Sequence, residues 1–202
     1  LAESWREEFN RSQSPFYYVI IGPHVYSDRM HRGTSKPITA EALPLFWLQQ
    51  MNVENLIENT GFVVVSDLID DVKDIHPSYK WIVGERLSRI ALAKNYGFSD
   101  IEWSGPRVKN TACVGDSILI RFDHTANGLK TNDRRRLTWF EISDENNAFL
   151  PALAEIRDRE TVVVWHPSIK KPKAVRFGWH ETAIPNLVNS EGLPAAPFNT
   201  ML

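Results

Sequence analysis

The residues of this chain best suited to acid–base chemistry lie in one short stretch, residues 70–77. It contains His76, with Asp74 two positions before it and Asp70 and Asp71 close by. A carboxylate beside a histidine can fix the tautomer of the imidazole ring and stabilise the imidazolium, which is the logic of catalytic triads. The stretch therefore predicts a catalytic base that needs a nucleophile from elsewhere. The competing interpretation is a solvent-exposed loop histidine near a helix N-terminus.

An apolar strand and a long helix flank this stretch. Residues 62–65 are apolar and mostly β-branched, and residues 78–96 carry Val83, Leu87 and Ile90 at helical spacing. Such runs are typical of a buried strand followed by an amphipathic helix. A histidine placed after the carboxyl end of a strand lies where α/β sheets build their sites.

The first half of the chain alternates helices and strands. Apolar residues at every fourth position predict a helix over residues 1–9, and residues 16–21 are typical of a central strand. Thr39 is expected to cap a helix that runs to about Asn55. Together with the strand and helix beside the acidic stretch, this order predicts a parallel sheet covered by helices. Such sheets usually have about five strands, so we expect further strands to precede Leu1.

From Ser99 onward the pattern changes to short alternating strands separated by turn-forming residues. The expected strands cover residues 117–122, 137–142, 161–165 and 174–179. Regular short strands of this kind predict an antiparallel sandwich or a jelly-roll-like domain. We therefore predict two domains, an α/β part over residues 1–98 and a β-sandwich with an extended C-terminal strap over residues 99–202.

One further stretch resembles a nucleophile motif. Val114-Gly115-Asp116-Ser117 contains Gly-Asp-Ser, the nucleophile signature of one esterase superfamily. In that setting the serine should open a helix, so that backbone N–H groups form an oxyanion hole. Ser117 is instead followed by a strand pattern, so we interpret the stretch as a hairpin turn.

The remaining histidines do not predict a metal site. His24 and His31 share a loop with Asp28, but a metal site needs three or four convergent ligands. Three others are expected at turns or on the surface of the second domain: His124, His166 and His180.

Aromatic residues of the second domain have two possible roles. Flat apolar rings could stack on a sugar, or they could fill the core at alternating strand positions, which is the commoner fate of such residues. The residues concerned are Trp139, Trp165, Phe177 and Trp179.

Composition excludes several classes of partner. The formal net charge of the 202 residues is −2, which gives no bulk electrostatic case for binding nucleic acid or an anionic membrane. The basic run 134–136 is short and reads as a solvated turn. No apolar stretch approaches the ~20 residues of a membrane helix. Cys113 is the only cysteine, so intrachain disulfides are excluded.

Several stretches, in order along almost the whole chain, match one family together. The two most specific are Asp71-Val72-Lys73-Asp74-Ile75-His76-Pro77 and Val83-Gly84-Glu85-Arg86-Leu87. The others are residues 5–9, 15–18, 59–64, 91–97, 104–106, 122–124, 128–129, 140–142 and 192–198. On these stretches the chain resembles the sialate O-acetylesterase family, a branch of the SGNH/GDSL-type hydrolases.

The resemblance implies an esterase that removes O-acetyl groups from sugars such as sialic acid. His76 matches the family's catalytic histidine, a general base toward a serine and then a general acid toward the leaving hydroxyl. The superfamily often places its aspartate three residues earlier, where this chain has Lys73. Asp74 is the nearest substitute, Asp71 or Asp67 could bend back, and a serine–histidine dyad oriented by a backbone carbonyl is a further alternative.

The resemblance also implies that the nucleophile lies upstream of Leu1. We therefore expect this chain to be the C-terminal part of an SGNH-type enzyme with a three-layer α/β/α domain, completed by an N-terminal segment that carries the serine. It implies an acetylated sugar as substrate, no cofactor, no metal, and a secreted, periplasmic or lysosomal location. Two alternatives stay open: an acetylesterase for acetylxylan or another polysaccharide, and a non-catalytic carbohydrate-binding module.

Overall fold

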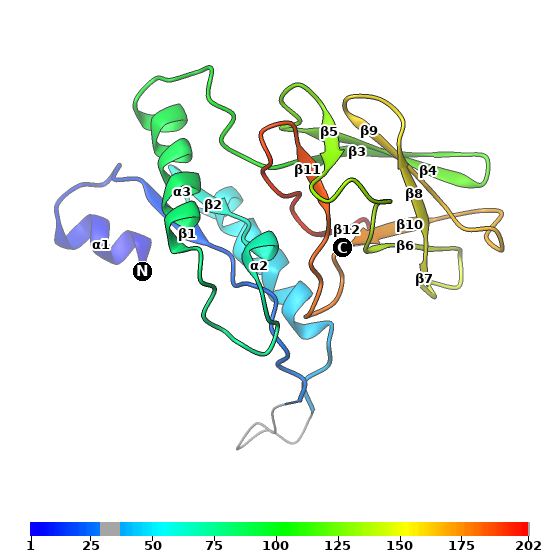
Figure 1. Cartoon of the computed structure of the whole chain (residues 1–202). Helices are drawn as coiled ribbons and strands as arrows, with labels where there is room; N and C mark the ends of the chain where they lie inside the picture. Colours follow the sequence, from blue (N-terminus) through cyan, green and yellow to red (C-terminus); the bar gives the residue numbers. More distant parts are fainter. Residues whose placement is uncertain (29–36, 202) are drawn as a thin grey trace.

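In the computed structural model, which describes residues 1–28 and 37–201, the helices and the antiparallel strands occupy different halves of the molecule (Figure 1). The first half contains α1 (Ala2–Glu8), β1 (Phe16–Val19), α2 (Ala42–Leu56), β2 (Thr60–Val63), the short 3₁₀ turn η1 (Ser66–Leu68) and α3 (Lys80–Asn95). The second contains β3 (Arg107–Val114), β4 (Ser117–Asp123), β5 (Leu129–Thr131), β6 (Phe140–Ser143), β7 (Leu150–Pro151), β8 (Leu153–Ile156), β9 (Thr161–Trp165), β10 (Ala174–Phe177), β11 (Leu187–Asn189) and β12 (Phe198–Asn199). The expected mixed α/β class is confirmed.

Strands β1 and β2 form a parallel sheet that lies between two helices. They pair in register from Phe16 with Thr60 to Val19 with Val63. Successive side chains of a strand point to opposite faces. Phe62 accordingly packs with residues of α2, whereas Val63 packs with Ile90 of α3. Strand β2 is therefore buried on both faces, as its unbroken apolar run predicts.

Strand β1 is less buried than predicted. All four of its residues are half-buried, although the apolar composition of residues 16–21 predicted a central strand. Among the described residues β2 is the only strand that pairs with it. Helix α1 forms as expected, but Trp5 and Phe9 of its apolar face are exposed. Trp5 makes an edge-on ring contact with Phe16 at 5.8 Å between centroids.

Helix α2 is capped two residues later than the expected cap at Thr39. Its N-cap is Glu41, and no side chain caps it. The reason is Pro44, which has no backbone N–H to donate and is tolerated only in a first helical turn. A helix capped by Thr39 would place Pro44 beyond that turn. At the C-terminal end of α3, Gly97 adopts φ +77°, as expected for a residue that ends a helix.

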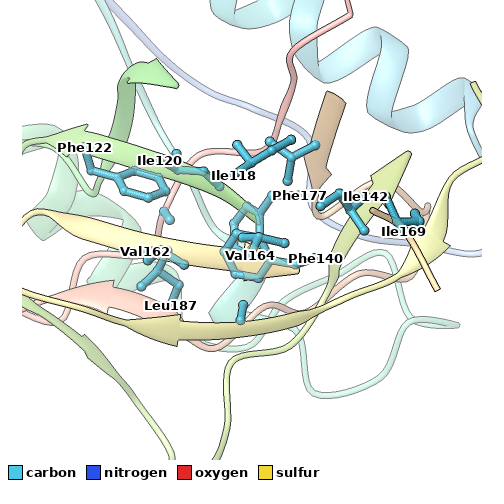
Figure 2. Close-up of a cluster of buried hydrophobic side chains, with 13 residues drawn as sticks. Ile118, Ile120, Phe122, Phe140, Ile142, Val162, Val164, Ile169, Phe177 and Leu187 are labelled. Atoms are coloured by element: carbon cyan, nitrogen blue, oxygen red, sulfur yellow. The ribbon is translucent and has the colours of Figure 1, made fainter. Parts of the chain in front are cut away.

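The second half consists of antiparallel sheets, as predicted. Two four-stranded sheets have the strand orders β3-β4-β9-β8 and β12-β10-β6-β7. Figure 2 shows that side chains from both sheets meet in one apolar cluster, with Ile120 and Val164 from the first sheet near Phe140 and Phe177 from the second. The four predicted strands all form. Six strands were missed, among them the eight-residue β3, and the boundary between residues 98 and 99 stays a prediction.

The Gly-Asp-Ser stretch forms the predicted hairpin. Strands β3 and β4 pair from Val114 with Ser117 onward, and Gly115 adopts φ +62° in the turn between them. Ser117 therefore begins a strand, and no helix N-terminus is available to build an oxyanion hole beside it. The structural interpretation of this motif is confirmed.

The C-terminal strap joins the two halves. Ala195 belongs to the apolar cluster between the antiparallel sheets, whereas the next residue, Ala196, belongs to the cluster beneath α2. The Ala196 N–H donates to the Pro106 carbonyl at 3.0 Å. In the part of the chain that the structure describes, no helix is long and apolar enough to cross a membrane.

The close approach of the strap to the interdomain segment gives a prediction. A Cβ atom at Gly105 would lie 1.8 Å from the carbonyl oxygen of Pro194. Backbone has to move to relieve such a clash, so Gly105→Ala should lower the free energy of unfolding by about 1–3 kcal/mol or more. Gly84→Ala is the matched control, because Gly84 lies in α3 with no atom within 4 Å of the added Cβ. It should stabilise the protein by about 0.5–1 kcal/mol. Urea unfolding of both variants tests the contrast, and equal effects would contradict it.

Candidate active site

The structure brings Asp74 and His76 together. The Asp74 Oδ1 atom accepts the backbone N–H of His76 at 2.9 Å and lies 3.1 Å from Nδ1 of its ring. The pKa of the Asp74 carboxyl lies below its ordinary value, mainly because of the hydrogen bond from the backbone N–H of His76 and secondly because of the contact with its ring. Asp74 is therefore ionised at neutral pH. The contact at Nδ1 leaves Nε2 of the imidazole as the nitrogen that could take a proton from a substrate or nucleophile.

The pair lies on the surface of the described residues. The side chains are 81% exposed for His76 and 62% for Asp74. Water screens the interaction of charges in such a position. The arrangement can orient a histidine as it stands, and its electrostatic effect would grow if another surface covered it.

The other two candidate carboxylates are used elsewhere. Asp67 forms a two-point ion pair with Arg86 of α3, with N–O distances of 2.7 and 2.5 Å. Asp71 accepts the backbone N–H of Lys73 at 2.9 Å. Neither turns back toward His76, so Asp74 alone among the candidates supports the ring in this structure.

Arg86 fixes the start of the loop that carries the pair. Besides Asp67, its guanidinium donates to the Val64 carbonyl at 2.7 Å, directly after β2. Both side chains of the ion pair are largely removed from water. Arg86 lies in one of the stretches that match the esterase family, but its pairing could not be predicted. Sequence spacing alone does not indicate that it would bind Asp67, nineteen positions away. This contact ties the carboxyl end of the parallel sheet to the helix that follows the site.

The loops after β1 and β2 lie side by side. The Val25 N–H donates to the Val72 carbonyl at 3.0 Å, so the loop after β1 touches the acidic stretch. Both loops follow the carboxyl ends of their parallel strands, at the lower end of the first half in Figure 1. Sites of α/β sheets form at this end. His24 is buried in this loop, and His31 lies outside the described residues.

The remaining candidates take local roles. The ring of His166 contacts the hydroxyl of Ser168, and that of His180 contacts Thr182. In the ranges 1–28 and 37–201, no three His, Cys, Asp or Glu side chains gather as metal ligands. The four aromatic residues cannot all present their rings to solvent, because Trp179 is only 3% exposed while Trp139 is 38% exposed. An aromatic sugar platform of these residues is therefore not supported.

A second acid–histidine pair was not predicted. Glu102 Oε1 lies 2.8 Å from Nδ1 of His124, whose ring packs edge-on against Trp103 at 4.6 Å between centroids. The pair lines a groove of about 870 Å³ between α3 and the antiparallel half. His124 adopts φ +58°, which sequence patterns do not reveal. This pair is more enclosed than Asp74–His76, but it does not follow a strand of the parallel sheet.

The chain is similar over nearly its whole length to the solved structure of another protein. A carbohydrate acetylesterase from Xanthomonas citri superposes with a TM-score of 0.83 and 26% sequence identity, covering 98% of this chain. The chain spans 43% of the length of that protein. No family model matches the chain, and no curated protein does. The likeness supports a relationship to carbohydrate esterases and does not separate sialate from other acetylated sugars.

The Arg86–Asp67 ion pair yields a stability prediction. Arg86→Met removes the partner of a largely buried carboxylate, which typically costs about 3–5 kcal/mol. Urea unfolding should show a loss of this size. Arg121→Met is the matched control, because the ion pair of Arg121 with Glu160 is exposed and should contribute no more than about 1 kcal/mol. Similar losses in the two variants would contradict the structural role of Arg86.

Proposed function

We propose that this chain is the histidine-bearing part of a carbohydrate O-acetylesterase. The observation that carries the proposal is the superposition of almost the entire chain on an acetylesterase of carbohydrates. The Asp74–His76 pair adds to it, because it follows the carboxyl end of β2 and has the Nδ1–carboxylate contact of a catalytic triad. Burial of Phe177 and Trp179 argues against a sugar platform made of all four aromatic residues, which weakens the alternative of a non-catalytic binding module.

In the proposed reaction His76 acts twice. Its Nε2 takes the proton of a serine hydroxyl as the serine oxygen attacks the acetyl carbonyl. The same proton then passes to the sugar oxygen as the ester C–O bond breaks, which leaves an acetyl-serine. Water, activated by His76, hydrolyses this intermediate and releases acetate. Asp74 holds the ring and balances the charge of the imidazolium.

The serine of this mechanism comes from a segment outside the 202 residues, within the SGNH-type arrangement that the sequence resembles. Among the described residues, the hydrogen-bond partner of the His76 ring is Asp74, and no described serine is bonded to it. That segment would also cover the exposed pair and lower its contact with water. We propose sialate esters as substrates from the resemblance, with acetylated polysaccharides such as acetylxylan as the alternative. A secreted, periplasmic or lysosomal location belongs to the same proposal.

The role of His76 is testable in the protein as it occurs naturally, with its nucleophile segment present. His76→Ala should lower kcat/KM for p-nitrophenyl acetate by about 10⁴-fold or more, because the base is lost. Acetate release from O-acetylated sialic acid and from acetylated xylo-oligosaccharides, measured side by side, identifies the sugar.

Two other histidines serve as controls. His166→Ala removes a histidine of the antiparallel half and should leave turnover unchanged. His124→Ala removes the competing acid–histidine pair and should also keep near-normal turnover, once thermal unfolding verifies that the variant is folded. If His124→Ala abolishes turnover while His76→Ala retains it, the assignment of the base is wrong.

A further inference from the structure

Glu181 is a buried carboxylate in the antiparallel half, and its hydrogen-bond partners among the described residues lie in the other half. It is 2% exposed. Its Oε2 accepts the backbone N–H groups of Tyr26 and Ser27 at 2.8 and 2.9 Å, and its Oε1 accepts the Ser27 hydroxyl. No basic side chain forms an ion pair with it among the described residues. The charge is instead solvated by N–H and O–H donors of the loop after β1.

The backbone of Glu181 holds the same loop at two more points. Its carbonyl accepts the N–H of His24 at 2.9 Å, and its N–H donates to the carbonyl of Ala40 at 2.9 Å. Residues 24–27 and residue 40 lie on the two arms of the segment between β1 and α2. One residue of the antiparallel half therefore fixes both arms of this segment.

The clamped segment adjoins the candidate base. Val25 lies between two residues that bond to Glu181, and its N–H donates to Val72 in the acidic stretch at 3.0 Å. Two residues further on, the Asp74 N–H donates to the Asp71 carbonyl at 3.0 Å. A continuous series of short contacts thus runs from Glu181 to the turn that presents His76.

The contacts of Glu181 suit a carboxylate better than an amide. Burial raises the pKa of Glu181, but the hydrogen bonds from Ser27 and Tyr26 outweigh it, and the net pKa lies below its ordinary value. The group is ionised at neutral pH and accepts on both oxygens. A glutamine keeps one accepting oxygen for the two backbone N–H groups, and its NH₂ group can only donate to the Ser27 hydroxyl oxygen, which reverses that contact. Hydrogen bonds to a neutral amide are also weaker than those to a carboxylate, so the substitution weakens the contacts that hold the loop.

We propose that Glu181 is a positioning residue of the esterase site, through which the antiparallel half sets the loop that borders His76. The inference rests on the proposed function and deepens it. It makes the antiparallel half part of the catalytic unit, rather than an appended module. Glu181 touches neither substrate nor nucleophile in this role and acts through residues 24–27.

The test compares Glu181→Gln with Glu155→Gln in the natural protein. Glu155 is an exposed residue of β8, so the control makes the same change of glutamate to glutamine and leaves the contacts of Glu181 with residues 24–27 intact. For p-nitrophenyl acetate, Glu181→Gln should lower kcat about 10–100-fold, the scale expected when catalytic groups are misplaced by about 1 Å. The control should retain wild-type kcat and KM. Ser27→Ala, which removes one donor and keeps the backbone contacts, should lower kcat in the same direction by a smaller factor.

Amide hydrogen exchange separates this inference from the proposed function. In Glu181→Gln, residues 24–28 and 71–76 should exchange faster together, while β9 keeps its protection. Unchanged kcat together with unchanged exchange would overturn the inference. Exchange at β9 that rises as much as exchange at residues 24–28 and 71–76 would also overturn it, because the variant would then be generally less stable. If the wild-type protein hydrolyses no acetyl ester, the proposed function fails and the catalytic role of Glu181 fails with it. The exchange data then still decide whether the clamp exists.

Discussion

The burial of β2 on both faces is the constraint on which the first half of the structure depends. Phe62 and Val64 face α2, and Val63 and Val65 face α3. Each such side chain contributes roughly 1.5–3 kcal/mol when it is fully removed from water. A strand held in this way cannot slide by one residue, because a slip would exchange its two faces. The loop that follows it, with His76, therefore leaves the sheet at a fixed place.

Polar contacts then fix the loop and select the partner of His76. Arg86 binds Asp67 and the carbonyl of Val64, which attaches the loop to α3 and removes one carboxylate from competition for His76. Asp74 is left as the partner of the ring. A pair as exposed as this one is weak in water, so its chemistry depends on what covers it.

The two halves are joined by buried contacts rather than by a flexible link. The strap places Ala195 in one core and Ala196 in the other, and Glu181 of the antiparallel half solvates its charge with donors from the loop after β1. Separating the halves would expose apolar surface and leave a carboxylate and several N–H groups without partners. The predicted division at residue 98 therefore separates two parts that share buried contacts across the boundary.

The sequence by itself determined the features that depend on local periodicity and on single residues. The apolar run of β2, the helical spacing of α3, the alternation of β4 and β9 and the turn at Gly115 all follow from neighbours in the chain. The Asp74–His76 contact spans only two residues, but the sequence alone left Asp71 and Asp67 as alternatives to Asp74. Only the tertiary structure decided that Asp67 belongs to Arg86, that Glu181 belongs to residues 24–27, and that Glu102 and His124 share a groove. These contacts join residues 19 to 155 positions apart. No local pattern encodes them, because a charged side chain chooses its partner only after packing has brought the candidates together.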